Sequence, residues 1–260
     1  YKTMEYLLQK GAAPNHYSFK EGSILEKNVL FLDTTATRLL LQYGANAEKV
    51  SLGVFDRYEK YTDAETEANQ DPHIKDRIYT IVEMFYKKGV KLYLKGFSYP
   101  HKIDLYLKYF PEEKDSLYLN ACIVCNEKVI EHLEQKGAKA SREELNNHLS
   151  YMLSYMMFVK GEKKLEACKR VLKYLVNKGA DINTYNKAKS IISHNALIYE
   201  ESNYYQIIYF LIENGANPFL KDKDGDNVLM MLKETYKGNK KEYKKLIKYL
   251  KKQEKLYKQQ

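Results

Sequence analysis

The sequence lacks the features of a disulfide scaffold and of a membrane protein. Its 260 residues include no Trp and three Cys, which are Cys122, Cys125 and Cys168. Three cysteines do not form a disulfide framework, so we expect free thiols in a reducing compartment. No apolar run approaches the ~18 residues of a membrane-spanning helix, and no secretory signal pattern is visible. These observations predict a cytoplasmic protein without a membrane span.

Catalytic and cofactor-binding motifs are also missing. There is no Gly-x-Ser-x-Gly element and no phosphate-binding glycine loop. The histidines occur singly along the chain, as His16, His73, His101, His132, His148 and His194. We therefore expect no enzyme activity and no cofactor.

Two short patterns suggest metal sites but do not fit one. Cys122-x-x-Cys125 lies near His132, yet zinc takes four ligands and no second pair is present. Both cysteines fall within an expected helix, where they would be small core residues. The second pattern consists of Asp222, Asp224 and Asp226 around Gly225. The glycine is not sixth and the twelfth residue is Lys233, so the calcium-loop spacing fails and a turn is expected.

Positive charge is concentrated at the C-terminus. The net charge is +9, and residues 237–260 contribute +8 of it through ten Lys and two Glu. Apolar residues recur between these lysines at helical spacing, so the segment is expected to be a basic capping helix with one buried face. The remainder of the chain has no large excess of either charge.

Residues 204–232 show a structural unit most clearly. The apolar stripe of its first helix consists of Ile207, Ile208, Leu211 and Ile212. Gly215 follows, and glycine ends helices readily because it enters the left-handed conformation without a Cβ clash. A turn at Asp224-Gly225 and a cap at Asn227 then predict a second helix. The unit is therefore helix, glycine stop, turn and helix.

This unit resembles the ankyrin repeat. Residues 211–217 (LIENGAN) are similar to the end of the family's outer helix, and residues 221–232 (KDKDGDNVLMML) to its turn and Thr-Pro-Leu-His helix start. Asn227, Val228, Leu229 and Met230 stand for those four residues, and three of them depart from the pattern. The resemblance implies an all-α ankyrin-repeat solenoid of stacked helix-turn-helix units with irregular inserts, which binds proteins.

Six glycines follow helical patterns along the chain and mark the expected repeat ends. They are Gly11, Gly44, Gly89, Gly137, Gly179 and Gly215, and Ala follows five of them. The intervals between them are 33, 45, 48, 42 and 36 residues, and only the first equals the ankyrin period of 33. We therefore expect one divergent array over residues 1–260, with about six helix pairs and several insertions.

Other elements are expected between these glycines. Helical patterns cover residues 23–32 and 114–125, and Ser141 with Glu144 forms a capping-box signature at the start of a long helix. A polar insert is expected over residues 62–72 and an irregular insert, punctuated by Pro100 and Pro111, over residues 96–110, with a helix beginning at Ile74 between them. A terminal helix is expected over residues 240–258.

Aromatic and basic residues follow several glycine stops, where the resemblance implies turns that project beside a concave groove. They are Tyr17, Phe19, Tyr185, Lys187, Lys189, Phe219, Lys221 and Lys223. Exposed aromatics beside lysines suit anchors on a protein partner, although some could instead fold back on the next repeat. We expect a monomer that binds a folded protein through its concave face and turn tips. The partner would be acidic, or a toxin or enzyme that this protein inhibits or neutralises, as immunity, antitoxin and effector proteins do.

The basic C-terminal helix leaves a second function open. Concentrated lysines attract nucleic acids and anionic membranes. Tyr243 and Tyr257 are expected on the buried stripe, however, so few aromatics remain for base stacking. We expect the helix to be a cap and do not expect nucleic acid as the partner.

Overall fold

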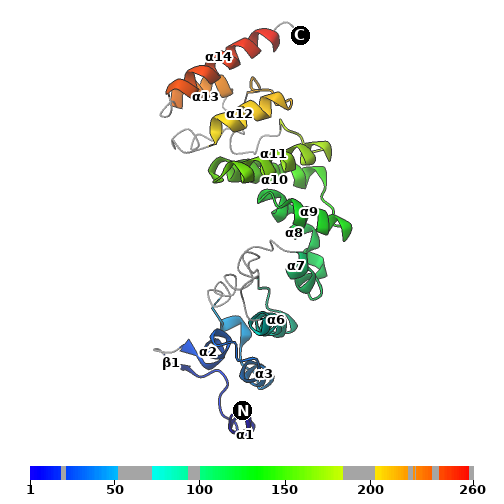
Figure 1. Ribbon diagram of the computed structural model, residues 1–260, viewed down its shortest axis with the longest axis vertical. Helices are drawn as coiled ribbons and strands as arrows, with labels where there is room; N and C mark the ends of the chain where they lie inside the picture. Colours follow the sequence, from blue (N-terminus) through cyan, green and yellow to red (C-terminus); the bar gives the residue numbers. More distant parts are fainter. Residues whose placement is uncertain are drawn as a thin grey trace. The chain divides into compact units, whose positions relative to one another are not determined.

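Helices make up nearly all of the structure that the computed structural model describes, apart from two short strands (Figure 1). The described residues are 1–18, 22–51, 72–92, 100–183, 203–221, 225, 227–235 and 240–257. They divide into two compact units, Tyr1–Glu112 and Glu113–Gln260. The all-α class expected from the sequence is confirmed. That both units belong to one array stays a prediction.

The first unit opens with α1 and a short antiparallel hairpin, in which Tyr17 pairs with Ser23. Helices α2 and α3 then pack against each other, and α3 packs against α6. The elements are α1 (Lys2–Gln9), β1 (Tyr17–Ser18), β2 (Gly22–Ser23), α2 (Ile24–Leu30), α3 (Thr34–Gln42), η1 (Ala47–Lys49), α6 (Pro72–Lys87), α7 (Pro100–Leu107) and η2 (Pro111–Glu113).

Aromatic side chains form the core between α6 and α7. Phe85 is fully buried, and the Tyr86 ring meets Tyr106 and Phe110 edge-on at centroid distances of 5.5 and 5.6 Å. The Tyr86 hydroxyl donates to the Leu92 carbonyl at 3.1 Å, and burial raises the pKa of Tyr86. The buried hydroxyl is therefore satisfied, and the edge-on rings add to the free energy of apolar burial.

Two expectations for this region were wrong. An irregular insert was expected over residues 96–110, but Pro100–Leu107 forms α7. The helix at Ile74 was expected two residues late, because α6 begins at Pro72. Both helices start with proline, which is tolerated in the first turn because those N–H groups have no intrahelical acceptor.

The second unit contains seven described helices. Helix α8 packs against both α9 and α10, and α10 packs against α11 and α12. The chain then continues to α13 and α14, which also pack together (Figure 1). The helices are α8 (Lys114–Ile123), α9 (Glu127–Gln135), α10 (Arg142–Phe158), α11 (Glu162–Asn177), α12 (Tyr204–Glu213), α13 (Val228–Thr235) and α14 (Lys240–Tyr257).

Side chains cap several of these helices as the sequence indicates. Ser141 and Glu144 form the expected capping box at the start of α10. The Asn227 side chain accepts a hydrogen bond from the Met230 N–H at 3.0 Å. Each satisfies N–H groups that have no partner within the helix, which stabilises the helix start by about 1 kcal/mol.

Helices α2 and α3 form one pair, and α8 and α9 form another. In each of these pairs, the two helices are joined by a very short turn. Leu32 follows α2 with φ of 55°, and Cys125 follows α8 with φ of 54°. The next residue is in each case the cap of the second helix: Asp33 accepts from the Ala36 N–H, and Asn126 from the Val129 N–H. The same left-handed residue and Asx cap thus recur in both units.

A glycine lies two residues after the end of α1, α3, α6, α9, α11 and α12. All six glycines noted in the sequence have positive φ, between 78° and 104°. At Gly179, the glycine N–H donates to the Val176 carbonyl at 2.9 Å and the Ala180 N–H to the Leu175 carbonyl at 3.0 Å. This is the Schellman pattern, which satisfies two carbonyls at the helix end.

We predict that Gly179→Val destabilises the protein by roughly 1 to 2 kcal/mol. No atom lies within 4 Å of a Cβ built at Gly179, whose φ is +104°. The loss would therefore come from the backbone conformation and not from a clash. Urea denaturation followed by circular dichroism measures it, with Gly179→Asn as the matched variant because Asn tolerates this conformation better. Equal stability of the Val and Asn variants would contradict the explanation.

Candidate functional site

A chain of hydrogen bonds connects successive turns in the second unit. The Asp181 N–H donates to Asn146 Oδ1 at 2.8 Å, and the Asn183 N–H donates to Asp181 Oδ1 at 2.8 Å. The Asn217 N–H then donates to Asn183 Oδ1 at 2.7 Å, and the Phe219 N–H to Asn217 Oδ1 at 2.9 Å. The Asp181 and Asn217 side chains order their own turns, whereas Asn146 on α10 and Asn183 each accept from the backbone of the next turn. The two kinds of contact together fix the spacing of the turns.

The first unit has the same arrangement one repeat apart. The Asn46 N–H donates to Asn15 Oδ1 at 2.7 Å, and Asn15 Nδ2 donates to the Gly44 carbonyl at 3.0 Å. Asn46 and Asn217 each come directly after a Gly-Ala pair. In both units the backbone N–H at that position donates to an Asn side chain of the preceding turn, and its own side chain accepts from the N–H two residues later.

Three of the turn residues expected to bind a partner lie in the described structure. Tyr17 is 65% exposed on β1, in the first unit. In the second unit Phe219 is half-buried and Lys221 is exposed. Phe19, Tyr185, Lys187, Lys189 and Lys223 lie outside the described residues. Exposure favours Tyr17 and Lys221 as anchors, and the half-buried ring of Phe219 is the weaker candidate.

Exposed apolar residues on or directly after four described helices that begin a pair, α2, α8, α10 and α13, were not anticipated. In the second unit they are Val124 directly after α8, Tyr151 and Phe158 on α10, and Met230 on α13. We call these four residues the first-helix face. In the first unit Ile24 on α2 and Phe31 directly after it are also exposed. Among the residues whose side-chain burial the structure describes, α3, α9, α11, α12 and α14 expose no large apolar side chain, whereas the leading helix α1 exposes Tyr6 and Leu7.

The exposure of Tyr151 and Phe158 follows from the register of α10. These residues are seven apart and are 57% and 58% exposed, whereas Leu149, Met152 and Met156 form the buried side of the same helix. Seven residues make about two helical turns, so both rings lie on one side. Aromatic residues that fall off a predicted core stripe were the available signal in the sequence.

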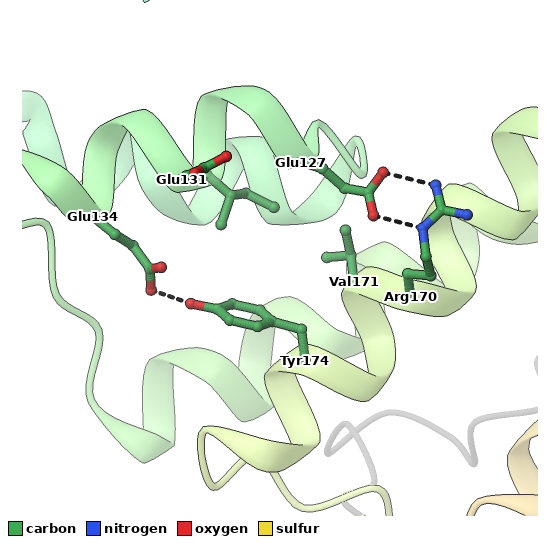
Figure 2. Close-up of a pocket in the computed structure, with 7 residues that line it drawn as sticks. Glu127, Glu131, Glu134, Arg170, Val171 and Tyr174 are labelled. Carbon is green, nitrogen blue, oxygen red and sulfur yellow. Dashed lines mark hydrogen bonds and ion pairs between the residues drawn. The ribbon is translucent and has the colours of Figure 1, made fainter.

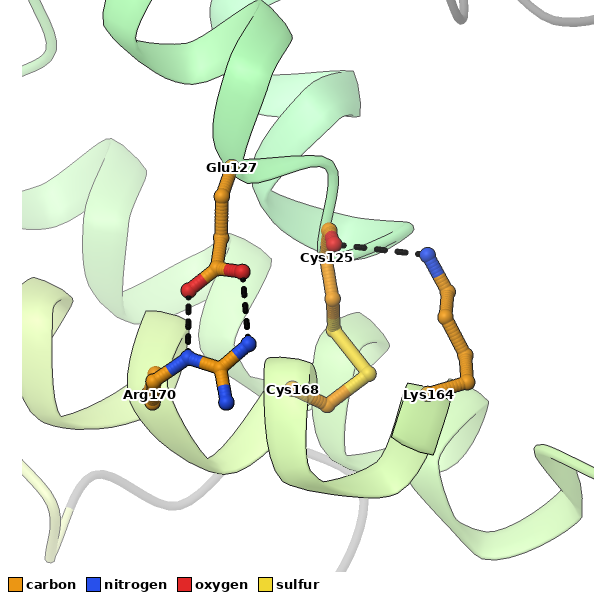
Figure 3. A network of polar contacts seen from close by, with 5 residues as sticks. All are labelled: Cys125, Glu127, Lys164, Cys168 and Arg170. Carbon is orange, nitrogen blue, oxygen red and sulfur yellow. Dashed lines mark hydrogen bonds and ion pairs between the residues drawn. A yellow bond between two sulfur atoms is a disulfide. The ribbon is translucent and has the colours of Figure 1, made fainter. Parts of the chain in front are cut away.

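A disulfide corrects the expectation of free thiols. Cys125 and Cys168 are bonded, with their Cα atoms 4.8 Å apart (Figure 3). Cys125 also lies after α8 and not inside a helix, so its expected helical position was wrong. The sequence could not indicate the pairing, because the two residues are 43 apart and meet only when α9 and α11 stack. The reducing compartment inferred from cysteine usage loses its support.

Polar contacts surround this bond. Arg170 binds the Glu127 carboxylate through Nε and Nη2, both at 2.8 Å, and Lys164 Nζ donates to the Cys125 carbonyl at 3.3 Å (Figure 3). The Arg170 hydrogen bond lowers the pKa of the Glu127 carboxyl. Together with the disulfide, these contacts fasten the start of α9 to α11.

Among the described residues, Cys122 is a free cysteine, and its thiol is buried. Burial raises its pKa to about 12, so it carries no reactive thiolate near neutral pH. Its expected role as a small core residue fits this environment.

Within the described ranges, no group of three or more His, Cys, Asp or Glu is placed to hold a metal ion. Asp222, Asp224 and Asp226 lie outside those ranges. No described helix has the length and apolar character needed to cross a membrane.

Helix α14 packs on α12 and α13 through its apolar side. Leu246 and Leu250 are fully buried, and the Tyr249 ring contacts Tyr209 at a centroid distance of 5.0 Å. Its exposed lysines are Lys240, Lys241, Lys244, Lys245, Lys248, Lys251, Lys252 and Lys255. One helix thus combines a buried stripe with a basic exposed side, which is the pattern of a terminal cap.

Comparisons with known proteins identify no family for this chain. No family model matches, and no curated protein matches. Among solved structures, the chain is similar to the crystal structure of the human ASB11 ankyrin repeat domain. The identity is 14%, the coverage is 87% of this chain and 84% of that chain, and the TM-score is 0.31. A TM-score of this size is too low to support a structural assignment. The repeat architecture therefore rests on the helix pairs, glycine caps and linked turns of the chain itself.

Proposed function

We propose that this chain is a non-enzymatic module that binds a folded partner protein through the first-helix face and the adjoining turns. The observation that supports this most strongly is where the exposed apolar side chains lie. Single exposed apolar residues are ordinary on protein surfaces. Here they recur on first helices, and two of them are aromatic residues two turns apart on α10. Large aromatic side chains are the residue types that dominate binding energy at interfaces.

The linked turns support a rigid mode of recognition. Hydrogen bonds from Asn146 through Asn183 to Phe219 fix the spacing of the turns before any partner arrives. A surface that is already ordered loses less conformational entropy on binding. We propose that the protein covers a surface of its partner and thereby inhibits or neutralises it, with no chemical step.

The double variant Tyr151→Ala, Phe158→Ala tests the proposal. Both residues are more than half exposed, so the variant should keep the circular dichroism spectrum of the wild type. Proteins captured by the wild type from a lysate should bind the variant at least about tenfold more weakly, as the loss of two aromatic anchors implies. Glu213→Gln on α12 is the matched surface control and should capture the same proteins. Unchanged capture by the double variant would refute the proposal.

A second function, binding to an anionic surface through α14, is favoured by the exposed lysines of that helix. Deleting α14 would expose the apolar surface that covers Leu246 and Leu250, so substitution is the sharper test. Replacing Lys244, Lys248, Lys251 and Lys252 with Gln removes charge from exposed positions only. If α14 is merely a cap, the wild type and this variant should both fail to bind phosphatidylserine vesicles and double-stranded DNA at physiological salt, and both should retain protein capture.

A further inference from the structure

A groove between α9 and α11 shares no lining residue with the first-helix face. It has a volume of about 370 Å³ (Figure 2). Pockets that hold small ligands are typically about 300 to 1,000 Å³, so this groove matches one long side chain better than a large molecule. Its lining residues are Glu127, Ile130, Glu131, Glu134, Arg170, Val171 and Tyr174.

The floor of the groove is apolar and its two ends are closed. Ile130 and Val171 are among the buried residues of the core and form the floor. At one end Arg170 pairs with Glu127, beside the disulfide. At the other end the Tyr174 hydroxyl donates to Glu134, as Figure 2 shows. These crosslinks hold α9 against α11, so the groove is formed before a ligand enters.

Glu131 distinguishes the middle of the groove from its ends. The carboxylates of Glu127, Glu131 and Glu134 occupy successive turns of α9. The first is bound by Arg170, and the third accepts from Tyr174 and pairs with Lys178 at 3.2 Å. Glu131 is exposed and has no hydrogen bond or ion pair with any described residue. One carboxylate is therefore available to a ligand.

We propose that this groove binds an arginine side chain presented by a partner protein. The aliphatic part of the arginine would lie on Ile130 and Val171, and its guanidinium would pair with Glu131. Arg170 and Lys178 pair with two of the three carboxylates, Glu127 and Glu134. One negative charge therefore remains, at Glu131, although the chain as a whole carries +9. A cation is favoured over an anion here.

Arginine fits this site better than lysine for two physical reasons. Its planar guanidinium matches a carboxylate with two hydrogen bonds and is less strongly hydrated than an ammonium group. It also stacks on aromatic rings, and Tyr174 lines the groove. The same chain already shows this geometry in the two hydrogen bonds between Arg170 and Glu127.

Methyl NMR with N-acetyl-argininamide tests the proposal directly. We expect the methyl signals of Ile130 and Val171 to shift with saturation, at a dissociation constant on the order of 1 mM for a probe of this size. The citrulline amide has the same shape without the charge and should cause no saturable shift. The lysine amide should bind more weakly than the arginine amide.

Two variants separate this site from its surroundings. Glu131→Gln should weaken binding of the arginine probe about fivefold, as the loss of one exposed ion pair implies, whereas Glu213→Gln should leave this binding unchanged. The double variant Tyr151→Ala, Phe158→Ala should retain the shifts, because the proposed groove is independent of the first-helix face. The proposal is overturned if the citrulline or lysine amide binds as well as the arginine amide, or if Glu131→Gln binds it with unchanged affinity.

Discussion

Replacing Cys168 with alanine is expected to lower the free energy of unfolding by about 2 to 4 kcal/mol. The disulfide to Cys125 closes a loop between residues 43 apart. Without it the unfolded chain gains entropy, and for a loop of this length the chain-entropy model gives about 4 kcal/mol. Urea denaturation under non-reducing conditions measures the change. Reduction of the wild type should produce a similar loss, and reduction of the variant should produce none.

Two matched variants separate the bond from its surroundings. Cys122→Ala removes a buried thiol that is not bonded, so it should cost only about 1 kcal/mol. Cys125→Gly also breaks the disulfide but relieves the left-handed conformation at φ 54°. It should therefore be more stable than Cys168→Ala by about 1 kcal/mol. If Cys168→Ala and Cys122→Ala were equally stable, the disulfide would not contribute to the fold.

Phe85→Ala should be the most damaging single substitution in the first unit, with a loss of about 3 to 5 kcal/mol. Phe85 lies on α6 and is completely buried, with a relative solvent accessibility of 0%. Truncation loses the transfer free energy of the ring and leaves a cavity in the core of the first unit. Thermal or urea unfolding of the purified variant measures the loss.

Phe31 supplies the matched control for this substitution. It is the same residue type in the same unit but is 73% exposed. Phe31→Ala should therefore change the free energy of unfolding by no more than about 0.5 kcal/mol. Similar losses for Phe31→Ala and Phe85→Ala would mean that Phe31 is buried in solution and that the first unit packs differently.

Local signals in the sequence predicted local structure well. The Ser141 capping box, the Asn227 cap and the helices around them depend on residues within a few positions of each other. Such contacts form within one turn of chain, so their pattern is visible in the sequence. Errors arose where proline was taken as a boundary, because Pro100 in fact begins a helix.

The candidate sites could be predicted only in part, because they depend on contacts between repeats. The disulfide joins residues 43 apart, and the arginine groove needs α9 beside α11. Apolar periodicity shows which face of a helix is buried but not which neighbour covers it. Tyr151 and Phe158 were recognisable in principle, since they lie off the stripe of α10 that includes Met152 and Met156.

The short turns within helix pairs determine where this protein tolerates added chain. Between α2 and α3, and between α8 and α9, a left-handed residue and an Asx cap leave no room for insertion. The glycine-to-glycine intervals, in contrast, range from 33 to 48 residues. Peptide grafts for engineering should therefore be placed between pairs, after the Asx-linked turn that follows a Gly-Ala stop, and not within a pair. The Asx-linked turns would then keep neighbouring repeats in register around the graft.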